Sequence, residues 1–479
     1  MIKTFSIFLE KGKHNMKNKY LDLIEQTFDF PQEEFEVKNG LLHFRGLNLT
    51  ALIEEYGAPF RFTYLPVIGQ QIEKCRSWFN DSMQKQNYMG NYRYCYCTKS
   101  SHFSFVLEEC AKHNVNIETS SAFDIDIIIN LYQKGLLSEE TYVLCNGYKT
   151  ETYIDKIKEL IDLGFTRIIP VVDNFQEFTL LDEKIDTPLE IGIRIASEED
   201  PKFEFYTSRL GIGYKDIIPF FNKKLKGHKK FKLSMMHFFV NTGIRDNAYY
   251  WNELRKFLTV YQDLINIGAP VKYLNVGGGF PVKNSLGFEF DYEYMVQEII
   301  HQIKLSADEV KAPHPDIFTE FGSFTVAEAG GMIFTILDQK KQNDREKWNM
   351  INGSFMTTLP DTWAINKRFV MLPINQWNEP YERVFLGGLT CDSDDYYNSE
   401  QHVNAIYLPT YSKSKPLYVG FFNCGAYQES VSGYGGIKHC LIPAPKHILI
   451  DHDENGNVVH KLFNEQQTSE QMLKILGYK

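Results

Sequence analysis

The sequence has little of three features that identify particular classes of protein. Its eight cysteines are scattered, with no CxxC pair and no cluster at metal-ligand spacing with histidine, so we expect no metal site. No stretch approaches 18 consecutive apolar residues, which argues against a transmembrane helix and a membrane partner. Basic residues are not in excess, since the formal net charge is −10, and this argues against nucleic acid as a partner.

What is present fits a large globular protein. The chain has 479 residues, 43% of them hydrophobic and 23% charged, which is enough for two domains that act on small polar metabolites. We expect most cysteines to be buried, reduced thiols in a cytoplasmic protein. The first apolar run is too short for a secretory signal, so we predict an N-terminal extension at 1–15, then a helix from Met16.

Eight strand-like segments between Tyr94 and Glu320 alternate with amphipathic, helix-like stretches. They read YCYC, VNIETS, TYVLC, RIIPVV, LEIGIRI, KLSMMHFFV, KYLNV and DIFTE. Their spacing of about 32 residues is typical of a (β/α)8 barrel of the TIM type. An open, doubly wound sheet is the alternative, because alternation alone barely separates the two, but eight evenly spaced segments favour the barrel.

A different pattern follows Phe324, where short β-rich runs alternate with Gly, Pro and Asn turns. It predicts a separate C-terminal β domain, a β-sandwich or β-barrel. The early segment EFEVKNGLLHFRGLNLT contains a hairpin-like Asn-Gly pair and is predicted to join that domain. We therefore expect an α/β fold in which residues 16–55 join the β domain, 56–325 form the barrel and 326–479 form the β domain.

The stretch YCYCTKSS reads as a buried strand that ends on a lysine. Alternation places Cys95, Cys97 and Lys99 on one face, where a bare ammonium is costly and tends to lose its charge. In a (β/α)8 barrel the chemistry lies at the carboxyl ends of the strands. The residues at those predicted ends are Lys99, Glu118, Ser121, Arg194, His237 to Thr242, Gly277 to Gly279, and Glu320.

Three successive glycines in LNVGGGFP follow the seventh strand, where barrels often bind phosphate. Because they lack Cβ atoms, the N–H groups of Gly277 to Gly279 can approach a phosphate closely, although a tight turn is the other interpretation. Together with Lys99 and Glu320, this loop suggests pyridoxal phosphate (PLP) as cofactor. Lys99 would form the Schiff base and Glu320 would keep the pyridine nitrogen protonated.

Seven motifs in this order resemble those of the fold type III PLP decarboxylases, which include ornithine, diaminopimelate and biosynthetic arginine decarboxylases. They are YCYCTKSS, IETSSAFD, HFFVNTG, LNVGGGFP, EFGSFTVAEAG, LTCDSDDYY and GAYQES. The resemblance runs from about Tyr56 to Ile450. It implies an alanine-racemase-like barrel followed by a β domain.

The resemblance also implies roles for individual residues. Lys99 looks like the Schiff-base lysine, Glu320 like the partner of the pyridine nitrogen, and Tyr427 like a contact to the cofactor phosphate. Cys391 and Asp392 resemble residues that a neighbouring subunit contributes, which implies a homodimer with shared active sites. The other positions that match the cofactor pocket are Glu118, Arg194, Phe239, Thr242, Gly277, Gly278, Gly279 and Gly322.

Within this family the sequence favours a substrate with a cationic tail. The CDSDD loop offers Asp392, Asp394 and Asp395 and no nearby arginine, although solvated loop acids are the other interpretation. The strings LPDTW and GAYQE resemble segments of biosynthetic arginine decarboxylases. We therefore predict Asp361 near the substrate guanidinium, where the bare sequence would indicate a Pro-Asp turn.

Two positions depart from the family pattern. Phe239 stands where the family has a histidine stacked on the cofactor ring, and a phenyl ring can stack but cannot donate a hydrogen bond or titrate. Ser323, in EFGS, replaces a basic contact to the phosphate. Both departures bear on the substrate rather than on the cofactor.

Our hypothesis is an arginine decarboxylase that releases CO2 and forms agmatine for polyamine and spermidine biosynthesis. Lys99, Glu320 and Cys391 would be catalytic, with Cys391 returning a proton to the α-carbon. The alternatives are decarboxylation of ornithine, lysine or diaminopimelate, a PLP racemase, and a non-catalytic regulatory homologue. A racemase needs a second acid/base opposite Lys99, and the presence of Lys99, Glu320, Cys391 and Asp392 argues against a non-catalytic protein.

Overall fold

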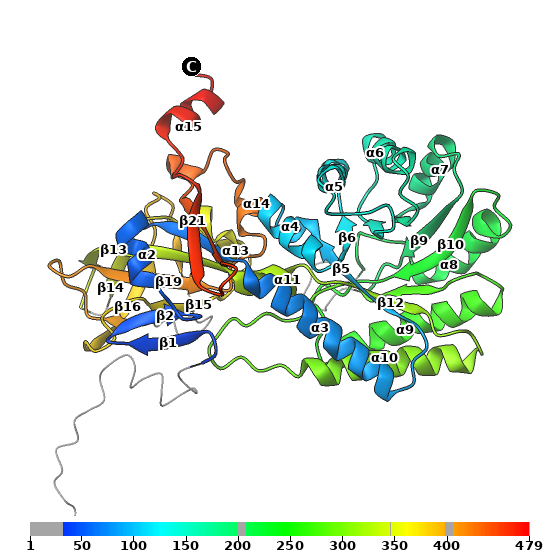
Figure 1. The fold of residues 1–479 in the computed structure, drawn as a ribbon, viewed down its shortest axis with the longest axis horizontal. Helices are drawn as coiled ribbons and strands as arrows, with labels where there is room; N and C mark the ends of the chain where they lie inside the picture. The colour runs from blue at the N-terminus through cyan, green and yellow to red at the C-terminus, as the bar shows by residue number, and fades with distance from the viewer. Residues whose placement is uncertain (1–31, 199–206, 345, 398–405, 479) are drawn as a thin grey trace, which may run out of the picture.

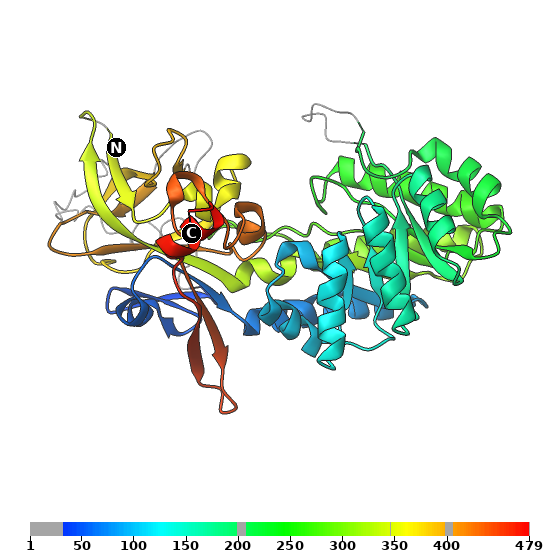
Figure 2. The same ribbon diagram turned by 90° about the horizontal axis from the view of Figure 1, so that it is seen from above.

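The computed structural model describes residues 32–198, 207–344, 346–397 and 406–478. The predicted extension at 1–15 and the helix expected from Met16 lie outside these ranges. In the described part, an α/β barrel and a β domain lie side by side along the longest axis of the molecule (Figures 1 and 2). None of the described helices is both long and apolar enough to cross a membrane.

Eight parallel strands close into a barrel, which confirms the predicted (β/α)8 architecture over the open sheet. Each strand pairs with the next one along the chain, and the last pairs with the first. Every strand coincides with one of the eight segments predicted from the sequence. Their bounds are β5 (Tyr92–Cys97), β6 (Asn116–Thr119), β7 (Val143–Cys145), β8 (Ile168–Val172), β9 (Leu189–Arg194), β10 (Phe231–His237), β11 (Tyr273–Asn275) and β12 (Asp316–Glu320).

Amphipathic helices cover the outside of the barrel (Figure 1). Helix α5 shows how their starts are fixed, because Ser121 caps it and the Asp124 carboxylate accepts the Ser121 N–H in return. Where such a side-chain cap is present, it fixes the loop between the strand end and the helix. The helices are α3 (Pro66–Lys85), α4 (Ser104–Lys112), α5 (Ala122–Gln133), α6 (Glu151–Asp162), α7 (Phe175–Lys184), α8 (Tyr214–Phe220), α9 (Ala248–Asn266) and α10 (Tyr292–Glu309).

The first barrel strand alternates as predicted. Cys95 points into the barrel and packs in its interior cluster, whereas Tyr94 and Tyr96 belong to the core between strands and helices. The strand ends earlier than the sequence suggested, at Cys97, and Lys99 follows in a 3-10 turn over Thr98–Ser100. Lys99 is therefore carried by the loop at the barrel mouth rather than by the strand itself.

The β domain contains a mixed ten-stranded sheet, which confirms a separate β-rich part. Strand β4 pairs with β13 and β20 of this sheet, so residues 60–64 belong to the β domain and the barrel begins with α3. The boundary predicted at residue 56 is corrected accordingly, because the partners of β4 lie far away in the chain, where local periodicity cannot show them. The strands are β4 (Phe60–Tyr64), β13 (Gly330–Lys341), β14 (Lys347–Ile351), β15 (Val370–Pro373), β16 (Tyr381–Gly387), β17 (Tyr396–Tyr397), β18 (Ile406–Pro409), β19 (Leu417–Phe422), β20 (Lys446–His452) and β21 (Val458–Asn464).

Short helices of the β domain carry two of the segments predicted to bind the cofactor or the substrate. The helices from the barrel exit onward are α11 (Ser323–Val326), α12 (Phe355–Thr358), α13 (Pro360–Ala364), α14 (Gln428–Ser432) and α15 (Ser469–Ile475). Helix α14 packs against both α12 and α13. The GAYQES and LPDTW segments, far apart in the sequence, are therefore neighbours in space.

The predicted N-terminal hairpin is present and lies against the β domain. Strands β1 (Phe35–Lys38) and β2 (Leu41–Phe44) flank Asn39 and Gly40, whose φ angles of 55° and 75° suit the tight turn expected from an Asn-Gly pair. A short strand β3 (Leu47–Asn48) completes this sheet, and α2 (Leu49–Tyr56) follows. The Phe44 ring stacks on Phe422 of β19, with centroids 5.4 Å apart.

A buried ion pair fixes the loop after β7, at the mouth of the barrel. The side chains of Lys149 and Glu177 are both fully buried, and Lys149 Nζ lies 2.8 Å from Glu177 Oε1. Lys149 also donates to the carbonyl oxygens of Gly147 and Val171. Burial raises the pKa of Glu177 in spite of the attraction of Lys149, so its charge depends on that lysine.

We expect Lys149→Met to lower the free energy of unfolding by about 3–5 kcal/mol, because it leaves a buried carboxylate without its cation. The double variant Lys149→Met/Glu177→Leu should recover most of this loss, since no buried charge remains. Urea denaturation measures both, with Lys158→Met, in an exposed pair with Asp162, as the control that changes little. A double variant as unstable as the single one would contradict this account.

Candidate active site

A cavity of about 420 Å³ opens at the carboxyl ends of the barrel strands, the end where such barrels carry their chemistry. All the predicted cofactor-binding residues line it except Thr242 and Gly277. The lining consists of Cys97, Lys99, Glu118, Ser120, Asn146, Gly147, Arg194, Leu210, His237, Phe239, Gly278, Gly279, Glu320, Gly322, Ser323 and Tyr427.

Lys99 is paired rather than bare. Its Nζ donates to Glu118 Oε2 at 2.6 Å, and the Glu118 side chain is fully buried at the end of β6. Burial opposes the charge on Lys99, but the negative charges of Glu118 and Glu320 outweigh burial and raise the pKa of Lys99. The lysine therefore keeps its proton in this arrangement, contrary to the expectation that it would lose its charge.

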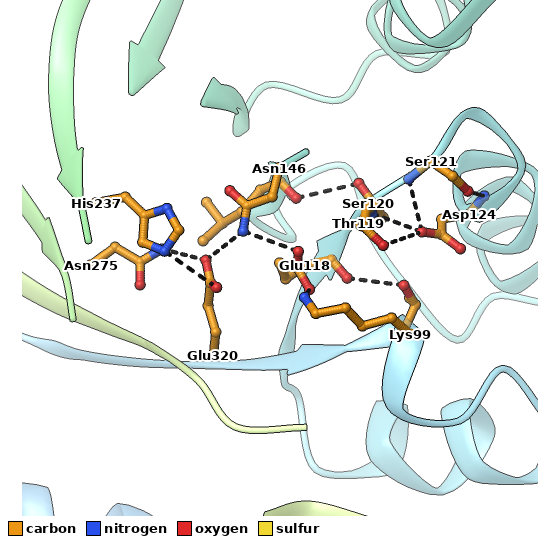
Figure 3. A network of polar contacts seen from close by, with 12 residues as sticks. Lys99, Glu118, Thr119, Ser120, Ser121, Asp124, Asn146, His237, Asn275 and Glu320 are labelled. Carbon is orange, nitrogen blue, oxygen red and sulfur yellow. Dashed lines mark hydrogen bonds and ion pairs between the residues drawn. The ribbon is translucent and has the colours of Figure 1, made fainter. Parts of the chain in front are cut away.

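One amide joins the two buried carboxylates of the cavity (Figure 3). Asn146 Nδ2, just beyond β7, lies 3.0 Å from Glu118 Oε1 and 2.7 Å from Glu320 Oε1, and donates to both. Asn275, the last residue of β11, donates to the same oxygen of Glu320 at 2.6 Å. The Glu320 carboxylate is thus held in one orientation from two sides, with Lys99 and Glu118 facing it across the barrel mouth.

His237 lies on the other side of Glu320. Its Nε2 is 3.5 Å from Glu320 Oε2, and its side chain is almost completely buried at the end of β10. Burial, followed by the nearby positive charge of Arg194, lowers the pKa of His237 well below its usual value. His237 is therefore a neutral imidazole that does not neutralise Glu320.

The three glycines after β11 are required by close backbone packing. A Cβ on Gly278 would lie 2.1 Å from the Glu320 carbonyl oxygen, and one on Gly279 would lie 2.6 Å from Gly243 Cα. Gly277 and Gly279 also have positive φ angles, of 70° and 103°. The triple glycine is thus explained by its contacts with β12 and with the loop after β10, and two of its members reach the cavity.

Tyr427 enters the cavity from the β domain. Its N–H donates to the carbonyl oxygen of Ser100, in the same turn as Lys99, at 2.8 Å. Its φ of 68° is a left-handed conformation that a tyrosine adopts only when its surroundings hold it there. This contact ties α14 to the lysine turn, so the cavity is built by both domains.

Phe239 and Ser323, the two departures from the family pattern, both line the cavity. The Arg194 guanidinium lies 5.9 Å from the centre of the Phe239 ring, a cation–π distance. Phe239 thus brings an aromatic ring to the cavity but no titratable group. Ser323 supplies a hydroxyl beside Gly322 in place of a cation.

The predicted substrate-binding residues lie outside this cavity. Asp361, in α13, binds Lys367 (3.1 Å) and Gln428 (2.8 Å), and Gln428 directly follows Tyr427. Cys391 and Asp392 are exposed on a loop of the β domain. Asp395 of the same loop is buried, and its carboxylate accepts the N–H groups of Phe355 and Thr390, so the loop offers fewer free acids than predicted.

Sequence reasoning missed Asn146 and Asn275. Each is a single amide at the end of a short strand, and nothing in the local pattern separates such an amide from a turn residue. Their positions at the ends of β7 and β11 were the available signal, because the same rule had selected Lys99, Glu118 and Glu320.

The cavity fits pyridoxal phosphate. Lys99 offers an amine for an aldehyde, and Glu320 offers a fixed carboxylate for a ring nitrogen. At the glycine end, the buried Thr242 hydroxyl has no hydrogen-bond partner within the described residues, and a phosphate would supply one. Lys99 and Glu320 line the cavity itself, and Thr242 lies next to Gly243, which packs against Gly279 of the cavity wall.

A family model described as "Pyridoxal-dependent decarboxylase, pyridoxal binding domain" matches residues 72–327. Among curated proteins, the biosynthetic arginine decarboxylase of Bacteroides thetaiotaomicron is 23% identical over 87% of this chain and 84% of its own length. That of Prochlorococcus marinus subsp. pastoris is 21% identical over 90% of this chain and 85% of its own length.

Two solved structures share the fold. The biosynthetic arginine decarboxylase of Campylobacter jejuni superposes with a TM-score of 0.78 at 20% identity, over 94% of this chain and 89% of that chain. The diaminopimelate decarboxylase of M. jannaschii in complex with L-lysine gives 0.76 at 17% identity, over 92% and 97%. At such identities the likeness establishes the barrel and the β domain, and does not distinguish substrates.

We expect Glu118→Gln to lower the pKa of Lys99, because it removes the attraction that outweighs burial. The pH dependence of reductive methylation of Lys99, read by mass spectrometry of its peptide, measures this. Glu109→Gln, which removes the partner of exposed Lys112, is the control and should leave Lys99 unchanged. An unaltered Lys99 profile in Glu118→Gln would show that the pair does not control its charge.

Proposed function

Since this chain belongs to the pyridoxal-dependent decarboxylases, we propose that it decarboxylates L-arginine to agmatine and CO2. The observation that carries the reaction type is the cavity in which Lys99 faces the fixed carboxylate of Glu320. The substrate is supported by the arginine decarboxylases that match about nine-tenths of the chain. We further propose that the product feeds polyamine synthesis and that the protein is cytoplasmic, where its eight free cysteines stay reduced.

Lys99 is the proposed attachment point: once deprotonated, its amine would hold the cofactor through the aldehyde carbon. When bound, pyridoxal phosphate supplies an electron sink for the pair that remains on the α-carbon as CO2 leaves. Glu320 would hold a proton at the ring nitrogen, and Asn146 and Asn275 keep its carboxylate in place. His237, being neutral, does not compete for that carboxylate.

Glu118 is the proposed partner of Lys99 during the reaction. The Glu118 carboxylate, 2.6 Å from Lys99 Nζ, would stabilise the ammonium form of Lys99 whenever this lysine is not bound to the cofactor. Phe239 would stack on the cofactor ring, and Arg194, Gly278, Gly279 and Gly322 complete the walls of the cavity. Thr242 and Tyr427 are the proposed hydroxyl contacts to phosphate.

We propose that Cys391 and Asp392 act in the site of a second copy of the chain. Both are exposed and absent from the cavity lining of their own chain, so they are available to another. Cys391 would deliver the proton to the α-carbon, and Asp392 would contact the substrate. The working unit is then a homodimer with two shared sites.

Asp361 is the proposed partner of the guanidinium. Its link through Gln428 to Tyr427 places the carboxylate one residue from the cavity wall, and substrate would have to displace Lys367 from it. Lys367 is one-third exposed and can turn toward water. A guanidinium binds a carboxylate more tightly than the Lys367 ammonium does, because it can form two parallel hydrogen bonds with it.

The substrate test is CO2 release from arginine, ornithine, lysine and diaminopimelate, each given separately to the holoenzyme. We expect arginine to be preferred, and Asp361→Asn to lower kcat/KM for arginine by about 10–100-fold through loss of a charged hydrogen bond. Asp453→Asn, in an exposed turn of the β domain, should change nothing. CO2 from diaminopimelate but not from arginine would contradict the proposal.

The shared site is tested by mixing two inactive variants, Lys99→Ala and Cys391→Ala. After dissociation and random reassociation, half of the dimers are mixed and each carries one intact site of two, so about a quarter of wild-type activity should return. Each variant reassociated with itself is the control. No recovery, in dimers shown by mass spectrometry to be mixed, would mean that Lys99 and Cys391 serve the same chain's site.

A further inference from the structure

Three soft-metal ligands meet on the surface of the β domain, away from the cavity walls. The ligand atoms of Cys391, His439 and Cys440 all lie within 4.8 Å of one another, and the two sulfur atoms are 3.4 Å apart. All three side chains are exposed. The cysteine spacing predicted no metal site, because these two cysteines are 49 residues apart in sequence and only the fold brings them together.

The backbone around Cys440 is held in an unusual conformation. Cys440 and Leu441 have successive positive φ angles, of 53° and 52°, which side chains other than glycine seldom adopt. The Cys391 N–H also points at the Cys440 sulfur, at 3.5 Å. Such conformations cost energy and persist where the surroundings enforce them, often at functional sites. Here the strained turn carries His439 and Cys440 to Cys391.

The spacing suits a tetrahedral ion. With zinc–sulfur bonds of about 2.3 Å, two thiolates on one zinc lie about 3.8 Å apart, so the observed separation requires only a small movement. Two thiolates and an imidazole leave a fourth position for water, as in open zinc sites. A disulfide is the competing outcome for two close thiols, but it would make no use of His439.

We propose that Cys391, His439 and Cys440 bind one Zn²⁺ per chain, and that the bound ion inhibits decarboxylation. Binding displaces the thiol protons to solvent, and sulfur and nitrogen lone pairs form the metal bonds, with no oxidation or reduction. The inhibition rests on the proposed function, because a metal-bound Cys391 can no longer deliver a proton in a second copy's site. The binding itself does not depend on the reaction.

The binding test uses the full-length protein, reduced and freed of metal. Co²⁺ as probe should give the intense thiolate charge-transfer and tetrahedral absorption bands at one ion per chain, and Zn²⁺ should displace it. His439→Gln and Cys440→Ser should weaken Zn²⁺ binding at least about 100-fold. His301→Gln, which removes an exposed histidine of α10, is the control and should bind as wild type does.

The proposal is overturned if no thiolate bands appear, or if His439→Gln binds Zn²⁺ as tightly as wild type. It is also overturned if oxidation of the reduced protein forms a Cys391–Cys440 disulfide as readily with Zn²⁺ present as without it. In a separate arm, Zn²⁺ should inhibit the holoenzyme, chelator should reverse this, and His439→Gln should need at least about 100-fold more Zn²⁺ for the same fractional loss. Binding without inhibition would overturn the regulatory half alone, whereas absence of any decarboxylation would refute the proposed function and leave the binding result standing.

Discussion

The site depends on how two buried carboxylates are held a short distance apart. Glu118 and Glu320 are both almost inaccessible to solvent, where like charges repel strongly and each charge is costly to bury. A single amide, that of Asn146, donates to both, while Lys99 neutralises one and Asn275 orients the other. The remaining negative charge on Glu320 faces the cavity, where a protonated ring nitrogen would complete the pairing.

The fold makes this arrangement possible because all of its members lie at strand ends of one closed barrel. Helix caps and the buried pair of Lys149 and Glu177 fix the loops, and the triple glycine allows the backbone of the loop after β11 to touch β12. The β domain then closes one side through Tyr427, whose strained backbone is bound to the lysine turn. Each restraint acts on the backbone, so the side chains converge with little freedom.

The barrel could be predicted because hydrophobic periodicity is local, and eight evenly spaced segments are compatible with few other folds. Lys99, Glu118 and Glu320 followed from one rule about strand ends. Three features could not be predicted, since each depends on contacts between distant parts of the chain. They are the place of β4 in the sheet of the β domain, the burial of Asp395, and the contact between Cys391 and Cys440. Asn146 was missed for a different reason: an amide has no pattern of its own, and its importance lies in two acceptors that only the fold brings to it.

The proposed chemistry depends on Lys99 as the residue that binds the coenzyme covalently. Borohydride reduction of the holoenzyme, followed by digestion and mass spectrometry, locates that bond directly. We predict a single pyridoxyl phosphate adduct, on the peptide that contains Lys99. An adduct on Lys149 or another lysine, or none in protein saturated with the coenzyme, would contradict this assignment.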